Sequence, residues 1–149
     1  MKLLSETNTT LLNVSMLLLR LAVGIILFVA GAGKVMGWFG GMGMDATINI
    51  FVTNMGIHPL LAYLSCYTEF IGGFLLIVGL LTRPAAFAIT INMLVAGIVT
   101  LPNGFMAGAS YPFSMMVSSI VILLAGPMAY SLDAQLLSGR KESAVFKRV

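Results

Sequence analysis

The sequence predicts an all-α membrane protein in which four transmembrane helices form a bundle, with a short interfacial helix in the first outer loop. Of the 149 residues, 59% are hydrophobic and only 9% are charged. A soluble domain carries roughly 25% charged residues, so lipid has to be the main solvent of this chain. The apolar residues gather in four runs. We expect one domain over residues 1–149, because this length suits a single unit.

The four apolar runs define the expected spans, since a bilayer crossing takes roughly 17–25 helical residues. Each run must be helical, because backbone groups inside lipid have no water to bond and must satisfy one another. Polar, glycine and proline residues separate the runs, as at Thr82-Arg83-Pro84. The expected spans are residues 14–32, 60–81, 85–101 and 112–130.

The first span contains the sequence Ala30-Gly31-Ala32, which resembles a signal-peptidase site. Arg20, however, lies inside the apolar run rather than before it, and the run is longer than the apolar core of a signal peptide. We therefore expect the first span to stay in the protein as a transmembrane helix.

The first loop is the longest, and residues 45–55 within it have the spacing of an amphipathic helix. We expect this helix to lie at the outer surface with its apolar face turned to the membrane. The alternative is that it forms a lid over a cavity that opens outward. The apolar face consists of Ile48, Phe51, Val52 and Met55.

Lysine and arginine residues are distributed unevenly between the two sides of the membrane. With the N-terminus in the cytoplasm, six of them lie inside and only Lys34 lies outside. The positive-inside rule therefore favours cytoplasmic N- and C-termini, with residues 131–149 as a cytoplasmic tail. We expect a multi-pass protein of the plasma (inner) membrane. The six inside residues are Lys2, Arg83, Arg140, Lys141, Lys147 and Arg148.

A charged residue lies within the first span and another within the second. Arg20 lies six residues into the first span, and Glu69 is the only acidic residue in the four expected spans. The rise of 1.5 Å per helical residue places them about 9 Å apart in depth, most of which two long side chains can bridge. An unpaired charge at this depth is expensive, so we expect an Arg20–Glu69 pair that faces the bundle interior.

Helical spacing gives each span one narrow face of small residues that carries one polar side chain. If these faces meet at the bundle axis, they form a buried polar centre, which is our candidate ligand site; catalytic residues stay unassigned. Two interpretations are open: the centre is functional, as ionisable residues in membranes commonly are, or it only locks the helices in register. The centre consists of Arg20, Glu69, Asn92 and Ser118.

The chain has one cysteine, Cys66, and one histidine, His58. This count excludes an intramolecular disulfide, a Cys-x-x-Cys redox pair and a histidine-based metal cluster within one chain. We therefore expect no metal site and no covalently bound cofactor. The lipid bilayer is the expected partner, and no nucleic acid is expected.

Four stretches carry a family resemblance: LLLRLAVGIILFVAGAGKV at 17–35, EFIGGFLLIVGLLTRPAA at 69–86, NGF at 103–105 and GPMAYSLDAQLL at 126–137. They resemble successive signatures of the DoxX family, small four-helix membrane proteins of bacteria and archaea, over nearly the whole chain. By this resemblance, seven residues occupy motif positions. They are Arg20, Lys34, Glu69, Gly73, Gly79, Arg83 and Asp133.

The resemblance implies a role in membrane redox chemistry, since members of the family are linked to a thiosulfate:quinone oxidoreductase and to methylamine utilisation. We expect a membrane subunit or partner of a quinone-linked redox complex, which as an enzyme would be an oxidoreductase subunit dependent on a partner protein. The alternatives are a non-catalytic scaffold or anchor held together by the Arg20–Glu69 pair and, third, a small-solute transporter. Each is compatible with an oligomer.

A quinone would need a cavity beside the polar centre, and small residues there would leave room for it. The expected walls are Gly24, Gly72, Gly73 and Ala96. The sequence also departs from the family pattern at three places, one of which is Met128-Ala129, where a glycine and an arginine are often found. Many members have a histidine at the position of Thr100 and a glutamate near Ser110 to Pro112.

Overall fold

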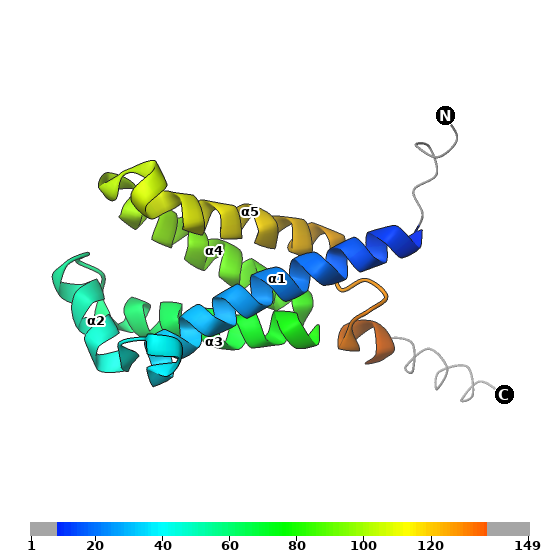
Figure 1. Cartoon of the computed structure of the whole chain (residues 1–149), viewed down its shortest axis with the longest axis horizontal. Coiled ribbons are helices and arrows are strands. Elements are labelled where there is room, and N and C mark those ends of the chain that lie inside the picture. Colours follow the sequence, from blue (N-terminus) through cyan, green and yellow to red (C-terminus); the bar gives the residue numbers. More distant parts are fainter. Residues whose placement is uncertain (1–8, 137–149) are drawn as a thin grey trace.

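The computed structural model describes residues 9–136, which form four long helices running side by side (Figure 1). Short helical segments extend α4 and α5, so that each of four spans has at least 20 residues and is apolar enough to cross a membrane. The predicted all-α, four-span fold is confirmed. The long helices are α1 (Thr9–Met36), α3 (Pro59–Val78), α4 (Thr82–Thr100) and α5 (Ser110–Ala125).

The four helices form two antiparallel pairs, α1 with α3 and α4 with α5 (Figure 1). The pairs converge where α3 turns into α4, which we call the closed end, and diverge toward α2 at the other end, which we call the open end. The main core lies where the pairs converge and draws on all four helices. Its buried residues are Val23, Leu27, Leu76, Ala85, Ala86, Ile89, Met93 and Ile122.

Glycine residues bring the backbones of α1 and α3 into contact. A Cβ atom added at Gly73 would lie 2.5 Å from the Phe28 nitrogen, and one at Gly24 would lie 3.0 Å from the Gly73 oxygen. Small residues are the usual means by which membrane helices approach closely. The faces that the sequence marks as narrow and small are therefore packing faces in this pair.

A short helix, α2 (Gly43–Thr53), follows a 3-10 turn at Trp38–Gly40, as predicted for the first loop. The predicted orientation of its apolar face is wrong for Ile48, which is buried against Ala62 and Cys66 of α3. The small side chains of these two α3 residues leave room for an isoleucine. The helix thus covers the start of α3 instead of offering its whole apolar face to lipid.

The fourth span begins earlier than predicted and ends at Ala125 instead of Tyr130. It starts with a short π-helix (Phe105–Ala109), preceded by a 3-10 turn (Leu101–Asn103). The end is set by Gly126, whose φ of 76° is left-handed, and by Pro127, which cannot continue a helix. The following segment, residues 126–136, crosses the closed end. The rest of the predicted tail, 137–149, lies outside the described residues, and so does Lys2.

Candidate functional site

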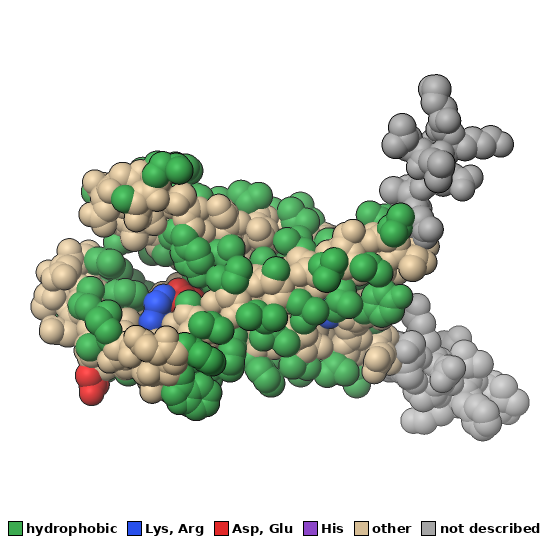
Figure 2. Space-filling view, in the orientation of Figure 1, with side chains coloured by type: hydrophobic (Ala, Val, Ile, Leu, Met, Phe, Trp, Pro, Cys, Tyr) green, Lys and Arg blue, Asp and Glu red, His purple; other side chains and the backbone are tan. Residues whose placement is uncertain are grey.

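A cavity of about 590 Å³ lies between the diverging helix pairs, toward the open end. Its walls are mostly apolar and come from α3, α4 and the start of α5, with Phe51 and Met55 at its outer edge. Figure 2 shows this hollow between α2 and the tip of the α4–α5 pair, with a basic and an acidic side chain touching inside it. The volume lies within the range of roughly 300–1,000 Å³ found for small-molecule sites.

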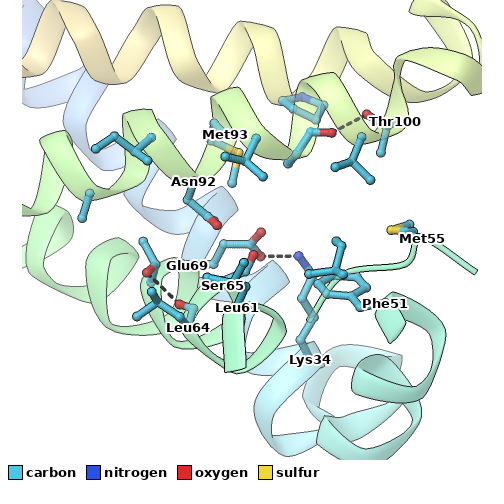
Figure 3. A pocket seen from close by; sticks show the side chains of 18 of the residues that line it. Lys34, Phe51, Met55, Leu61, Leu64, Ser65, Glu69, Asn92, Met93 and Thr100 are labelled. Carbon is cyan, nitrogen blue, oxygen red and sulfur yellow. Dashed lines mark hydrogen bonds and ion pairs between the residues drawn. The ribbon is translucent and has the colours of Figure 1, made fainter. Parts of the chain in front are cut away.

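Lys34 and Glu69 form an ion pair inside the cavity, with the lysine Nζ 2.5 Å from the Glu69 Oε2 (Figure 3). The Glu69 side chain is 4% exposed and that of Lys34 is 28% exposed. The lysine therefore reaches from the last turn of α1 toward a buried carboxylate. Its Nζ also lies 5.8 Å from the centre of the Phe51 ring, within cation–π range.

Asn92 of α4 lies across the cavity from Glu69 (Figure 3). Its Nδ2 atom is buried and has no hydrogen-bond partner among residues 9–136. Buried polar groups are normally bonded, and an unsatisfied one costs about 1–3 kcal/mol. Asn92 thus brings an amide with an unpartnered donor to the cavity wall, near an ion pair, and a small rotation of this side chain would let a polar ligand group complete the arrangement.

The predicted Arg20–Glu69 pair is wrong, and the reason is the register between α1 and α3. A Cβ atom at Gly31 would lie 2.8 Å from the Glu69 carbonyl carbon, so Gly31 is the residue of α1 beside Glu69. Arg20 lies beside Gly79, at the end of α3. Gly79 and Glu69 are ten residues apart, which is about 15 Å along a helix and too far for a direct pair.

Arg20 instead binds the segment that crosses the closed end. Its guanidinium donates hydrogen bonds to the carbonyl oxygens of Pro127, at 3.1 Å, and of Tyr130. The φ of Gly79 is 73°, which favours glycine, and a Cβ atom there would lie 2.9 Å from the Arg20 Cζ, so the guanidinium would have to shift. Arg20 therefore connects α1, the end of α3 and the segment after α5, outside the cavity.

Asp133 completes this cluster at the closed end. Its two carboxylate oxygens accept the backbone N–H groups of Leu81 and Thr82, each at 2.8 Å, and so cap α4. Burial alone raises the pKa of Asp133, but the hydrogen bonds from Thr82 and Leu81 and the charge of Arg20 outweigh it. The pKa of this carboxyl therefore lies below its usual value.

Ser118 is not part of a polar centre. It is half-buried on α5, and its hydroxyl donates to the Ser114 carbonyl oxygen at 2.9 Å. The fully buried serine is its neighbour Ser119, about 100° around the helix. The predicted single centre thus divides into three places: Arg20 at the closed end, Glu69 with Asn92 in the cavity, and Ser118 on α5.

Of the four residues predicted to wall the cavity, Ala96 lines it and the three glycines do not. The prediction is wrong for Gly24 and Gly73 because α1 and α3 are in backbone contact there. It is wrong for Gly72 because a Cβ atom would meet the Ile89 side chain at 3.0 Å. The cavity exists where two helices diverge, and these glycines lie where helices meet.

Lys34 is the cavity residue that sequence reasoning missed, since it was expected near the outer surface. A signal was present, because Lys34 follows Gly31 by three residues and so shares its helical face. Thr100 and Pro112, at two of the three places where the sequence departs from the family pattern, also line the cavity.

Comparisons with known proteins agree with the resemblance. The sequence profile of the DoxX family matches residues 15–102, a region that contains Lys34, Glu69 and Asn92. The chain is 35% identical over 137 residues to a Bacillus subtilis (strain 168) protein named "Putative oxidoreductase CatD". The match covers 89% of this chain and 95% of that protein. No solved structure matches the sequence.

Proposed function

This chain belongs to the DoxX family of membrane proteins, and we infer that it is the membrane subunit of a redox complex and binds a quinone in the cavity between its helix pairs. Two facts direct the inference toward redox chemistry. The first is the name of the Bacillus subtilis relative, which describes an oxidoreductase. The second is the chemistry of the cavity, where a few polar groups meet in an otherwise apolar space.

The unpartnered Asn92 amide near the Lys34–Glu69 pair is the observation that carries the proposal. A quinone ring is apolar on both faces and has two carbonyl oxygens that accept hydrogen bonds. Asn92 Nδ2 and the Lys34 ammonium are donors for such oxygens, and the Glu69 carboxylate is an acceptor for a hydroquinone hydroxyl. The apolar walls suit the rest of the ring.

Each of the three polar residues has a distinct role in this proposal. Asn92 orients the ring, because its donor has no competing partner among the described residues. Glu69 holds or releases a proton when a bound quinone is reduced or a hydroquinone is oxidised. Lys34 holds the Glu69 side chain in place through their ion pair and offers a second hydrogen-bond donor to the ring.

The electrons have to come from, or go to, another protein. The chain offers one cysteine and one histidine, too few for a dithiol pair or a bis-histidine haem within one chain. A partner that holds a flavin, a metal or thiols would supply the second half of the reaction. The chain described here would then contribute the quinone site and the membrane anchor.

The proposal is tested by the effect of a short-chain quinone, decyl-ubiquinone, on thermal unfolding of the protein in lipid nanodiscs. A ligand that binds only the folded form raises the unfolding temperature by mass action. We expect a dose-dependent rise for the parent protein and a much smaller one for Asn92→Leu, which removes the amide at similar volume. The matched control is Thr90→Val on the same helix, outside the cavity lining, and it should respond as the parent does.

No rise for the parent protein at saturating quinone would refute the proposal. An equal rise for Asn92→Leu and Thr90→Val would place quinone binding outside this cavity. The first outcome would favour a non-catalytic scaffold, supported by the Arg20–Asp133 cluster that fixes the closed end, whereas the second would keep quinone binding and reject this cavity as its site.

A further inference from the structure

α3 and α4 touch near the closed end and separate toward the open end. Gly72 and Ile89 lie together in this contact, where a Cβ atom at Gly72 would lie 3.0 Å from the isoleucine side chain. Each helix turns one face to the cavity, with lining residues at intervals of three and four. The facing residues are Leu61, Leu64, Ser65, Thr68 and Glu69 on α3 and Ala88, Ile91, Asn92, Val95 and Ala96 on α4.

Several of these cavity-lining side chains are also exposed on the outside of the bundle. Leu61 and Leu64 of α3 are 57% and 61% exposed, and Ile91 and Val95 of α4 are 47% and 50% exposed. A side chain that lines a cavity and is half exposed lies at its rim. The rim therefore runs along two membrane-spanning helices and, toward the open end, includes Met55 and Tyr111, which line the cavity and are 36% and 42% exposed. Between α3 and α4 the cavity opens sideways into the lipid chains.

The polar groups of the cavity lie deep in the membrane. Glu69 is ten residues from the start of α3 at Pro59, and Asn92 is ten residues from the start of α4 at Thr82. Ten residues are about 15 Å of helix, half of a hydrocarbon core that is about 30 Å thick. A ligand group that reaches them has to leave water and headgroups behind.

The charge of the site selects among lipid-soluble ligands. Lys34 and Glu69 together carry no net charge, so the cavity provides no counter-charge for a phosphate or an ammonium group at this depth, where a lone charge is expensive. An uncharged polar group with hydrogen-bonding atoms meets no such penalty. The suitable ligand is an uncharged ring on an apolar chain.

We propose that the ligand enters from the bilayer through the opening between α3 and α4, and that its apolar chain stays in this opening while its ring meets Glu69 and Asn92. This inference rests on the proposed quinone site and adds the route of access and the class of ligand: a quinone with a long apolar chain, dissolved in the membrane. Leu64 and Val95, on opposite sides of the opening, are the expected contacts of the chain.

Two photoreactive quinones test the route in phospholipid vesicles that contain the full-length protein. One carries an azide on its ring, and the other carries a diazirine at the middle of its alkyl chain. We expect the ring probe to label the cavity near Asn92 and the chain probe to label the rim residues of α3 and α4. Excess unlabelled quinone should compete with both.

A pair of matched variants tests whether the chain needs this opening. Val95→Trp fills the rim, whereas Val117→Trp adds the same bulk at a valine of α5 that is 56% exposed and does not line the cavity. We expect rim labelling by the chain probe to fall about tenfold or more in Val95→Trp, because a filled site rejects added volume. Val117→Trp should leave it unchanged.

The outcomes separate this inference from the proposed function. Ring labelling in the cavity with chain labelling on α2 or α5 would overturn the α3–α4 route and leave the quinone site intact. Unchanged rim labelling in Val95→Trp would overturn the route as well. The absence of any labelling that quinone competes with would instead remove the proposed function, and this inference with it.

Discussion

Arg20 and Glu69 find partners in an apolar bundle by two different means. Glu69 has a charged partner, Lys34, in the same cavity. Arg20 has backbone carbonyl oxygens as acceptors and the charge of Asp133 nearby. Carbonyl groups that follow a helix end have no hydrogen-bond donor within that helix. A buried arginine supplies these donors, and the carbonyl oxygens in turn accept the hydrogen bonds that its guanidinium needs. The first arrangement leaves polar atoms facing a cavity, whereas the second ties chain segments together.

The Asp133 cap gives the closed end a defined dependence on pH. Because its pKa is lower in the folded protein than in the unfolded chain, the cap stabilises the protein above the usual aspartate pKa and loses this effect as the pH falls through the folded value. Asp133→Ala should lower the free energy of unfolding at pH 7 by about 0.5–2 kcal/mol, the usual effect of losing an N-cap.

Thermal unfolding in nanodiscs between pH 7 and pH 3 measures this effect. The parent and Asp133→Ala should differ at pH 7 and approach each other at the acid end, where the parent carboxyl is protonated. Asp45→Ala is the control, because Asp45 is exposed on α2, at the other end of the molecule. A difference between parent and Asp133→Ala that stays constant down to pH 3 would contradict the proposed role of the carboxylate charge.

At the scale of elements, helical periodicity predicted which face of α1 and of α3 turns inward, because that face depends only on the sequence of one helix. The partner of Arg20 depends on register, which is fixed by where α1 and α3 begin and by the glycine contacts between them. Arg20 lies beside Gly79, about 15 Å from Glu69 along α3, whereas the predicted spans placed the two residues about 9 Å apart in depth. The pairing of Lys34 with Glu69 could not be predicted for the same reason, because it depends on the register between α1 and α3.

The glycine contact between α1 and α3 predicts a large effect from a small substitution. Gly73→Ala adds a Cβ atom 2.5 Å from the Phe28 nitrogen, and since this neighbour is backbone, the two helices have to move apart. Overpacking of this kind costs about 1–3 kcal/mol. Chemical or thermal unfolding in detergent should show that loss, whereas Ala22→Leu, on the exposed side of α1, should change stability little. Equal stability of the two variants would mean that the α1–α3 contact is looser than described.

At the scale of the whole molecule, the two ends differ in structure: one is tightly packed and the other contains the cavity. The closed end holds the main core and the Arg20–Asp133 cluster, and the open end holds α2 and the cavity. The number of spans and the short surface helix followed from hydropathy and spacing along the chain. The cavity did not, because it arises where two helix pairs diverge, and the angle between packed pairs depends on side chains from all four helices.

The charge distribution predicts which side of the membrane each end faces. Most Lys and Arg residues belong to the closed end or to the termini, so the positive-inside rule places the closed end in the cytoplasm and α2 outside.

Cysteine labelling tests this in a Cys66→Ala background, since Cys66 is the only cysteine and is buried. Asn49→Cys on α2 should react with a membrane-impermeant maleimide in intact cells, and Ala129→Cys at the closed end should react only after the cells are opened. Both positions are exposed, so a lack of access would report the membrane and not the fold. The reverse pattern would place α2 and the outer edge of the cavity in the cytoplasm, and a redox partner that meets this edge would then have to be cytoplasmic as well.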